Sequence, residues 1–335
     1  METFEQARPY QKLSSFHLKV IAMTTMFIDH FADGAIDCLM LVNGWWNVPN
    51  HPMIYAYYIM RLIGRIAFPL YLFMLSEGMF YSHDRRKYVG RIAIFALGMG
   101  LINVLGSGIL GLTPFSNYQG LFHYNAFVDL LMCASFIYFL EHDNKKLRWL
   151  AVLPVAYMVF HSIADNLLAA PMGKLYYLIS SFSPDYRYYG LLLFLGFYWT
   201  KKMLTKKFEG RVNALPYQVL VGAAVIMLVT VIELVLLLVF AFAYSGQSES
   251  FNEALTRGYY AVMGYFSLYM IDPLGWPYAL DGSMFGILAL PLLLFYNGQI
   301  GYSAPWFRRF EYLFYPGHVL IIIAIAMFIV MPFVI

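Results

Sequence analysis

Long, nearly uninterrupted apolar runs recur along this chain, and they constrain the fold more than any other feature. Residues 214–244 and 310–334, for example, hold very few ionisable side chains. A helix that crosses a hydrocarbon core of about 30 Å needs about 20 such residues. The composition agrees: 61% of residues are hydrophobic and 12% are charged, whereas soluble domains carry about 25% charged residues. We therefore predict an all-α, polytopic transmembrane bundle.

The runs predict about nine spans in a single integral membrane domain over residues 1–335. Residues 255–271 are also apolar and would make a tenth span. The first run has no small-residue cleavage site after it, so we expect a retained helix rather than a signal peptide. The expected spans are residues 18–42, 54–81, 89–112, 122–140, 148–170, 174–200, 214–244, 279–297 and 310–334.

Lys and Arg residues set the expected orientation, because cytoplasmic loops of membrane proteins are rich in them. Most of the 22 Lys and Arg residues fall in the N-terminal tail, in the loops after the second, fourth and sixth spans, and before the last span. These places share one side of the membrane if residues 255–271 do not cross. We therefore expect nine crossings and a cytoplasmic N-terminus.

Two adjacent ionisable residues, Asp29 and His30, lie in the middle of the first span. Ionisable groups at membrane depth are costly and usually functional. His30 is about twelve residues into the span, roughly 18 Å at 1.5 Å per residue. Lys19 is eleven residues earlier, almost three whole turns, so it shares a face with His30. Asp29 would orient His30 from a neighbouring helix or pair with an arginine; the alternative is that both residues merely hydrogen-bond between helices.

The second span carries Arg61 and Arg65, whose spacing of four places both guanidiniums on one face. This span runs back toward the cytoplasm, so we expect Arg65 to lie level with His30. An Asp29–Arg65 ion pair without a catalytic role is the plain structural alternative. Glu77 lies near the cytoplasmic end of the same span, and we expect a kink at Pro69.

Other polar residues lie in or beside the spans. His318 falls in the inner half of the last span, Asp165 in the fifth, and Asn125 at the start of the fourth. We expect all three to help line a substrate-binding cavity that also holds Asp29, His30 and Arg65. Cys38 and Cys133 form no disulfide framework or metal motif. We see no zincin motif, phosphate loop or Gly-x-Ser-x-Gly sequence, and we expect no metal and no nucleic-acid partner.

Four stretches of the sequence together form a recognisable set of motifs. They are Leu18-Lys19-x-Ile21-Ala22-Met23-x-x-Met26-x-Ile28-Asp29-His30, Arg61-x-x-Gly64-Arg65-x-Ala67-Phe68-Pro69-x-x-x-Phe73-x-x-x-Glu77-Gly78, Leu290-Pro291-Leu292-x-x-Phe295-Tyr296-Asn297-Gly298 and Tyr312-x-Phe314-Tyr315-Pro316-x-His318. At these four places the chain resembles the TraX family. The motifs come in family order and together cover nearly the whole sequence. The Lys19-x10-His30 spacing is also similar to a signature of acyltransferase-3 type membrane enzymes.

The resemblance implies a bacterial cytoplasmic-membrane acyltransferase with acetyl-CoA as donor. TraX proteins acetylate the N-terminus of conjugative pilin, so the implied acceptor is a peptide or small molecule with an amine or hydroxyl. His30 would act as general base or acyl carrier, Asp29 would orient it, and Arg65 and Arg61 would stabilise the oxyanion or bind an acceptor carboxylate. His318, Lys19 and Glu77 would complete the cavity or the donor entry, where the basic cluster Arg85-Arg86-Lys87 would also meet the donor phosphates.

Two other classes of function use the same polar residues. A small-solute or proton-coupled permease would use the His, Asp and Arg groups as a relay. Paired interrupted helices in two related halves would favour that reading, and the sequence shows none. The third alternative is a non-catalytic assembly factor.

Overall fold

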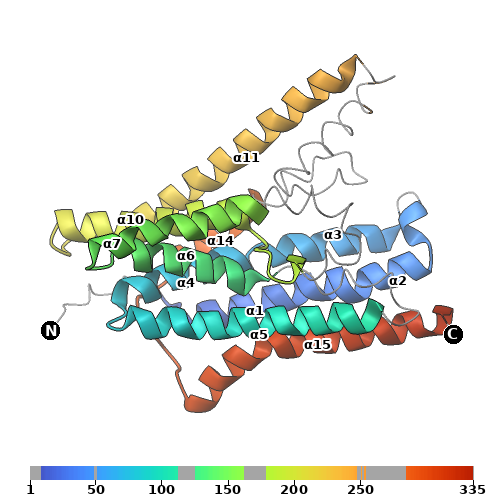
Figure 1. Cartoon of the computed structure of the whole chain (residues 1–335), viewed down its shortest axis with the longest axis horizontal. Coiled ribbons are helices and arrows are strands. Elements are labelled where there is room, and N and C mark those ends of the chain that lie inside the picture. The colour runs from blue at the N-terminus through green and yellow to red at the C-terminus, as the bar shows by residue number, and fades with distance from the viewer. Residues whose placement is uncertain are drawn as a thin grey trace. The chain divides into compact units, whose positions relative to one another are not determined.

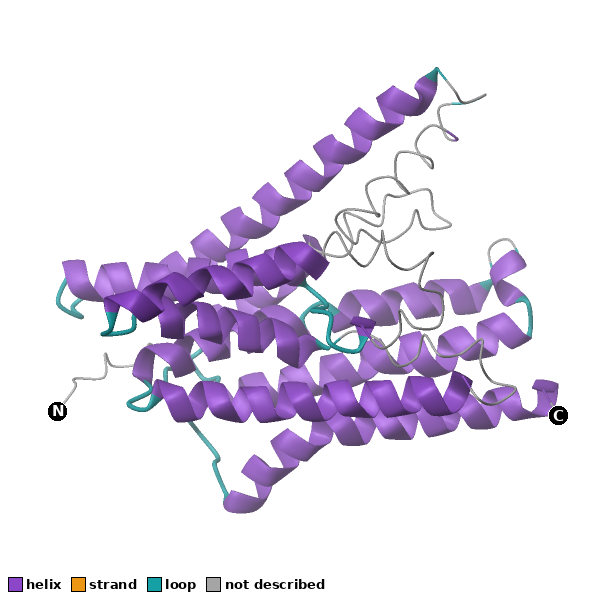
Figure 2. Cartoon of the chain, in the orientation of Figure 1, coloured by secondary structure: helices purple, strands orange, loops and turns teal. Residues whose placement is uncertain are grey.

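The computed structural model describes residues 9–48, 51–111, 125–161, 179–246, 250, 253 and 284–334. Within these ranges the secondary structure is helical, apart from one isolated bridge between Leu13 and Tyr296 (Figure 2). This confirms the predicted all-α class. The chain divides into two compact units: residues 1–74, 199–223 and 281–335 form the first, and residues 75–198 and 224–280 form the second.

The first expected span is a helical run that changes its winding just after His30. It comprises α1 (Ser15–Phe31), a five-residue π-helical turn η1 (Ala32–Ile36) and α2 (Asp37–Val42). A short 3₁₀ turn η2 (Trp45–Asn47) follows. π-Helical turns are rare inside α-helices and occur frequently at functional sites.

The second expected span is broken into α3 (Pro52–Gly64) and α4 (Ala67–Tyr81). The break at residues 65–66 lies one turn before Pro69. Proline has no N–H for the carbonyl four residues earlier, which here belongs to Arg65, and its ring clashes with that carbonyl. The expected kink is therefore present, but its site is the turn preceding the proline.

Gly64 lets α3 approach α1 closely. A Cβ added at Gly64 would overlap the Asp29 side chain, so the carboxylate packs directly on the α3 backbone. Arg61, one turn earlier in α3, contacts both Asp29 and Asp33. Higher numbers in α1 therefore meet lower numbers in α3, and the two helices run antiparallel.

Replacing Gly64 with alanine should destabilise the protein by about 1–3 kcal/mol, the usual cost of overpacking. The same change in a helix with free space is neutral or stabilising, because glycine disfavours helix by about 0.5–1 kcal/mol. Gly90→Ala in α5 (Arg85–Gly111) is the matched control, since no atom lies within 4 Å of its added Cβ. Thermal unfolding in detergent would measure both, and an equal rise of the two midpoints would contradict the close packing.

The C-terminal part of the first unit holds η6 (Phe285–Leu288), α14 (Ala289–Leu294) and the long α15 (Pro305–Val334). The described part of the expected span 279–297 is thus two short helices. The segment after α14 pairs with the start of α1: the Leu13 N–H donates to the Phe295 carbonyl, and the Asn297 N–H to the Leu13 carbonyl, both at 2.8 Å. This segment of the TraX-like motif therefore anchors the N-terminal end of α1.

Helix α15 lies beside α1 (Figure 1). Lys19 contacts Glu311, and His30 contacts His318, so the numbers rise in the same order and the helices run parallel. Two spanning helices that run parallel have an odd number of crossings between them, so the total number of crossings, counting both helices, is odd. This agrees with nine crossings rather than ten; residues 255–271 themselves lie outside the described residues.

The second unit begins within α4 and is built mainly from α5, α6 and α10. The Ser183-Pro184 step breaks the helix expected over 174–200, because a residue before proline disfavours the helical conformation. A new helix starts at Arg187, and Asp129 of α6 accepts hydrogen bonds from the N–H groups of residues 185, 186 and 187. Helices α10 and α11 continue from one unit into the other. The bounds are α5 (Arg85–Gly111), α6 (Ala126–Leu140), α7 (Lys145–Arg148), η4 (Trp149–Ala151), α10 (Arg187–Lys207) and α11 (Leu215–Ser245).

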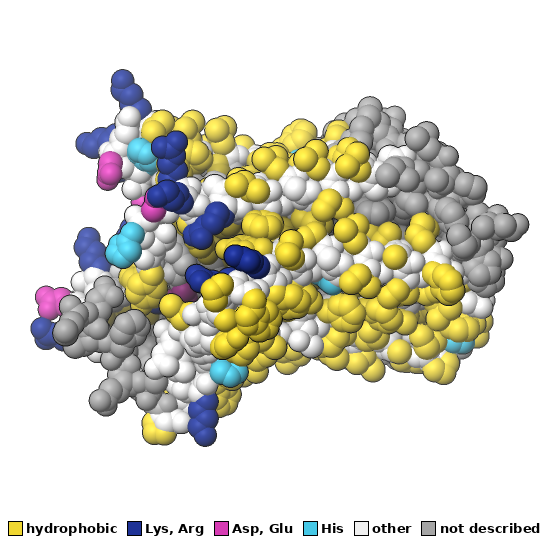
Figure 3. Space-filling model, turned by 90° about the horizontal axis from the view of Figure 1, so that it is seen from below, with side chains coloured by type: hydrophobic (Ala, Val, Ile, Leu, Met, Phe, Trp, Pro, Cys, Tyr) yellow, Lys and Arg dark blue, Asp and Glu magenta, His cyan; other side chains and the backbone are white. Residues whose placement is uncertain are grey.

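Four described helical segments are long and apolar enough to cross a membrane: residues 52–81, which comprise α3 and α4 together, and residues 85–108, 215–232 and 305–329. Many of their large apolar side chains point outward; Ile94 is 67% exposed and Phe328 is 78% exposed. Hydrophobic side chains cover much of the visible helix surface in Figure 3. Such surface suits contact with lipid, as expected for a membrane protein.

Candidate functional site

An ion-pair cluster joins α1 and α3. Nη1 of Arg61 lies 3.2 Å from Oδ2 of Asp29 and 3.3 Å from Oδ1 of Asp33. The side chains of Arg61 and Asp29 are only 11% and 9% exposed, whereas that of Asp33 is 51% exposed. The second carboxylate oxygen of Asp29 is buried and has no hydrogen-bond partner among the described residues. One guanidinium thus pairs with two carboxylates, and the second oxygen of Asp29 accepts no hydrogen bond from the described residues.

The arginine that pairs with Asp29 lies one helical turn before Arg65, the residue named in the structural alternative. The close approach at Gly64 fixes the register, so Arg61 meets the carboxylate directly. Arg65 lies at the end of α3, and both guanidiniums attract the Asp29 carboxylate through Coulomb forces. Asp29 therefore pairs with Arg61, whereas the structural alternative considered from the sequence named Arg65.

His30 contacts a second histidine rather than Asp29. Nδ1 of His30 lies 2.7 Å from Nε2 of His318, and the two ring planes differ by only 7°. The expectation that Asp29 orients His30 is wrong at the level of contacts, because neighbouring residues of a helix point about 100° apart and Asp29 faces α3. The residue that orients His30 is His318 of α15.

Aromatic side chains surround the histidine pair. Tyr315 meets both imidazoles edge-on, with ring centroids 5.8 Å from His30 and 5.5 Å from His318. Phe314 stacks on His318 at 4.7 Å, and Phe27 lies 6.2 Å from it. His318 is 4% exposed. These contacts restrict the orientation of the His318 imidazole.

Lys19 pairs with Glu311 of α15, with Nζ and Oε2 at 2.9 Å. The lysine side chain is 35% exposed and that of Glu311 is 17% exposed. The same two helices therefore meet through a Lys–Glu pair near their N-terminal ends and through the His30–His318 pair further along. The pair is partly exposed, so its contribution to stability is small, and a binding role for Lys19 stays a prediction.

The remaining predicted site residues fall outside this cluster or outside the described residues. Asp165 lies outside the described residues. Glu77 belongs to the part of α4 in the second unit. Asn125, also in the second unit, caps α6: its Oδ1 accepts from the Phe127 N–H, and its Nδ2 donates to the Ala96 carbonyl at 2.8 Å. The structure thus gives Asn125 a structural role in joining α6 to α5.

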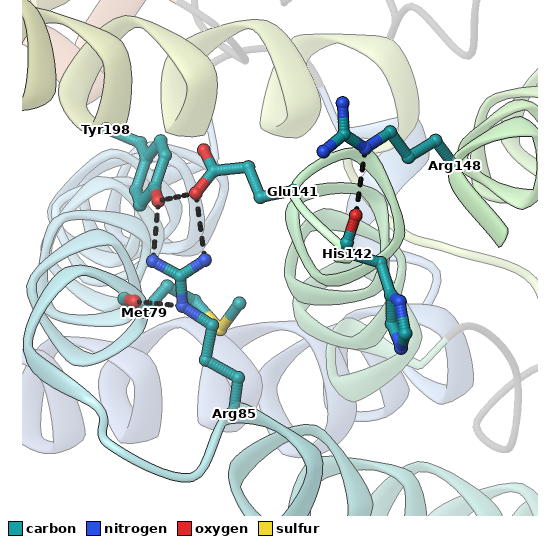
Figure 4. A network of polar contacts seen from close by, with 6 residues as sticks. All are labelled: Met79, Arg85, Glu141, His142, Arg148 and Tyr198. Atoms are coloured by element: carbon teal, nitrogen blue, oxygen red, sulfur yellow. Dashed lines mark hydrogen bonds and ion pairs between the residues drawn. The ribbon is translucent and has the colours of Figure 1, made fainter. Parts of the chain in front are cut away.

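A network of polar contacts surrounds the Arg85 guanidinium in the second unit (Figure 4). Its guanidinium donates to Oε2 of Glu141 at 2.8 Å, to the Tyr198 hydroxyl at 3.0 Å and to the Met79 carbonyl at 3.0 Å. Lys87 pairs with the neighbouring Asp84. We expected this basic cluster to meet donor phosphates, but Arg85 is committed to joining helices α4, α5, α6 and α10.

Sequence reasoning missed two residues of the first-unit cluster, Asp33 and Glu311. Asp33 follows Asp29 by four residues, so it lies on the same helical face, and that spacing is visible in the sequence. Glu311 is an acidic residue at the start of an apolar run, which is an equally visible signal. Among the described residues, no group of three or more His, Cys, Asp or Glu side chains is arranged to hold a metal ion.

Comparison with known proteins places these residues in a family. The family model described as "TraX protein" matches residues 14–271. A relative from Dichelobacter nodosus, named "Probable fimbrial assembly protein FimC, serogroup H1", is 38% identical over 84 residues. That match covers 25% of this chain and 29% of the relative, so the chain spans less than a third of the relative's length. No solved structure matches the chain significantly.

Proposed function

This chain belongs to the TraX family, and we propose that it is a membrane-embedded acyltransferase of the bacterial cytoplasmic membrane. It moves an acetyl or similar acyl group from acyl-CoA to an amine or hydroxyl acceptor. The name of the fimbrial assembly relative supports an acceptor of the pilin kind, such as a free peptide N-terminus. The likeness to acyltransferase-3 type enzymes stays a prediction.

The environment of His30 carries the proposal. Its Nδ1 contacts His318, while its Nε2 has no hydrogen-bond partner among the described residues. The ring lies at the centre of an apolar segment and beside a buried ion-pair cluster. An imidazole held at one nitrogen and open at the other is the arrangement that general-base catalysis uses.

In the proposed step, a neutral amine attacks the thioester carbonyl of acyl-CoA. A new N–C bond forms, the C–S bond breaks, and one proton passes from the amine to His30 and then to the leaving thiolate. We assign Arg65, at the end of α3 and close enough to attract the Asp29 carboxylate, to the negative charge that develops on the carbonyl oxygen.

The acidic side chains beside His30 favour an amine over a hydroxyl acceptor. The half-exposed Asp33 carboxylate is an acceptor for the N–H groups of an amine. An amine before deprotonation is a cation, and carboxylates bind it through charge-assisted hydrogen bonds. Asp33 therefore acts as the acceptor-binding residue in the proposed mechanism, and Asp29 holds Arg61 beside it.

The test is acyl transfer by the purified protein in lipid nanodiscs. Acetyl-CoA labelled in the acetyl group is supplied with a peptide that has a free N-terminus, with the same peptide N-terminally blocked, and with a peptide whose N-terminus carries a hydroxyl in place of the amine. We expect label on the free-amine peptide and release of CoA, both lost in His30→Ala. Equal CoA release by wild type and His30→Ala with every acceptor would contradict the proposed activity.

The Lys19–Glu311 pair allows a prediction about the donor. If Lys19 binds a phosphate of acyl-CoA, Lys19→Gln should raise the KM for the donor about tenfold with little change in kcat, since a charge-assisted hydrogen bond contributes about 1.5–3 kcal/mol. Glu311→Gln should lower the same KM, because it releases Lys19 from its present partner. Lys12→Gln, at an exposed position in the N-terminal tail, is the control and should change neither constant.

A further inference from the structure

A chain of two hydrogen bonds fixes the positions of protons on the histidine pair. Nδ1 of His318 lies 2.7 Å from the Phe314 carbonyl oxygen, and Nε2 of His318 lies 2.7 Å from Nδ1 of His30. A carbonyl oxygen only accepts, so Nδ1 of His318 carries the hydrogen and donates it. A neutral imidazole has one N–H and one lone pair, so Nε2 of His318 is the acceptor in its contact with His30.

The acceptor at His318 determines the tautomer of His30. Since Nε2 of His318 offers a lone pair, Nδ1 of His30 carries the hydrogen and donates it, and the lone pair of His30 resides on Nε2. We propose that His318 is a positioning residue that holds His30 in the Nδ1–H tautomer, which makes Nε2 the nitrogen that takes the acceptor's proton. The catalytic part of this inference rests on the proposed function; the tautomer itself does not.

The local sequence around His318 supports this arrangement. Pro316 lies two residues earlier inside α15, and proline removes a helix hydrogen bond and bends the helix. Figure 1 shows α15 bent in its N-terminal part. The Phe314 carbonyl, two residues before Pro316, accepts a hydrogen bond from the His318 side chain. Stacking with Phe314 and edge contact with Tyr315 hold the ring in the plane of His30.

The same hydrogen bond helps His30 more after it takes a proton. Once Nε2 is protonated, His30 is a cation, and its Nδ1–H still donates to Nε2 of His318. A hydrogen bond from a charged donor is shorter and stronger than one between neutral groups. The interaction therefore stabilises the charged state formed during the reaction more than the resting state, which is the requirement for a contribution to rate.

Two substitutions at position 318 separate the acceptor from the ring. His318→Gln places an amide oxygen near the position of Nε2 and keeps an acceptor for His30, so turnover should stay within about tenfold of wild type. His318→Phe keeps an aromatic ring for the stack but offers no acceptor, so kcat should fall about 100-fold or more. The KM values for donor and acceptor should change little in both. Similar turnover of the two variants would overturn the positioning role.

The tautomer can be measured without any activity. Solid-state NMR of protein labelled with ¹⁵N-histidine in lipid distinguishes a protonated from an unprotonated ring nitrogen, and the spectrum of His30→Gln identifies the His30 signals. We expect hydrogen on Nδ1 and none on Nε2. Hydrogen on Nε2 of His30 would overturn the proposal even if transfer is observed. If the protein shows the expected tautomer but transfers no acyl group, the hydrogen-bond chain through His318 stands and the enzymatic function is rejected.

Discussion

Replacement of His30 by glutamine is expected to abolish acyl transfer, with kcat reduced by about 1,000-fold or more. General acid–base groups contribute about 10²–10⁴-fold to rate, and an amide cannot accept the acceptor's proton. Glutamine keeps a polar side chain of similar reach, so the contact with His318 has a substitute and folding is retained. The measurement is single-turnover transfer of labelled acetyl groups to an amine peptide.

The matched control is His83→Gln, the same substitution at an exposed histidine between α4 and α5. It should leave kcat unchanged. Size-exclusion profiles and thermal midpoints of both variants should match those of wild type. Near-full transfer by a folded His30→Gln would make the residue structural, and the permease and assembly-factor alternatives would then explain the buried cluster better.

The architecture was largely predictable because it depends on long apolar runs. Bilayer thickness sets the length of such a run, so the helices over 85–111, 215–245 and 305–334 lie close to the expected ranges. The errors come from proline. Pro69 breaks the second span a turn before its own position, and Pro184 separates two segments that hydropathy alone joins. A hydropathy value is averaged over a window of residues, so it does not detect that a proline lacks a backbone N–H group.

The candidate site was predictable in its residue types but not in its pairs. Buried charge identifies Asp29, His30 and Arg61 from sequence alone, since each is expensive in an apolar run. Which of two arginines meets Asp29 depends on the register of α1 against α3, and a close contact at Gly64 sets that register. His318 is 288 residues from His30 along the chain, so only the parallel packing of α1 and α15 reveals their contact.

Two residues that the sequence analysis assigned to binding, Asn125 and Arg85, make structural hydrogen bonds near helix ends. Asn125 is polar and lies beside an apolar run, which is also the description of a helix cap. Arg85 begins the basic run Arg85-Arg86-Lys87, which resembles a phosphate site, yet it bonds a carboxylate, a hydroxyl and a carbonyl. Sequence alone does not separate these uses, because both need the same hydrogen-bonding groups.

Removal of Arg61 is expected to cause the largest loss of stability of any single substitution in the first unit. Arg61→Met keeps much of the apolar volume but leaves the carboxylates of Asp29 and Asp33 without their cation. Breaking a buried ion pair on one side costs about 3–5 kcal/mol, and Asp29 is the buried partner here, with its side chain 9% exposed. Chemical denaturation in mixed micelles would measure the change.

A second substitution separates the lost charge from lost packing. Asp29→Asn in the Arg61→Met background removes the uncompensated charge and should recover part of the lost stability, since the uncharged amide costs less to bury than an unpaired carboxylate. Arg211→Met is the matched control, because the Arg211–Glu209 pair is 82% and 76% exposed and such surface changes stay within about 0.5 kcal/mol. Additive losses in the double variant would show that Arg61 acts through packing alone. Recovery would establish that α1 and α3 are held together beside His30 by charge, in the register that the site requires.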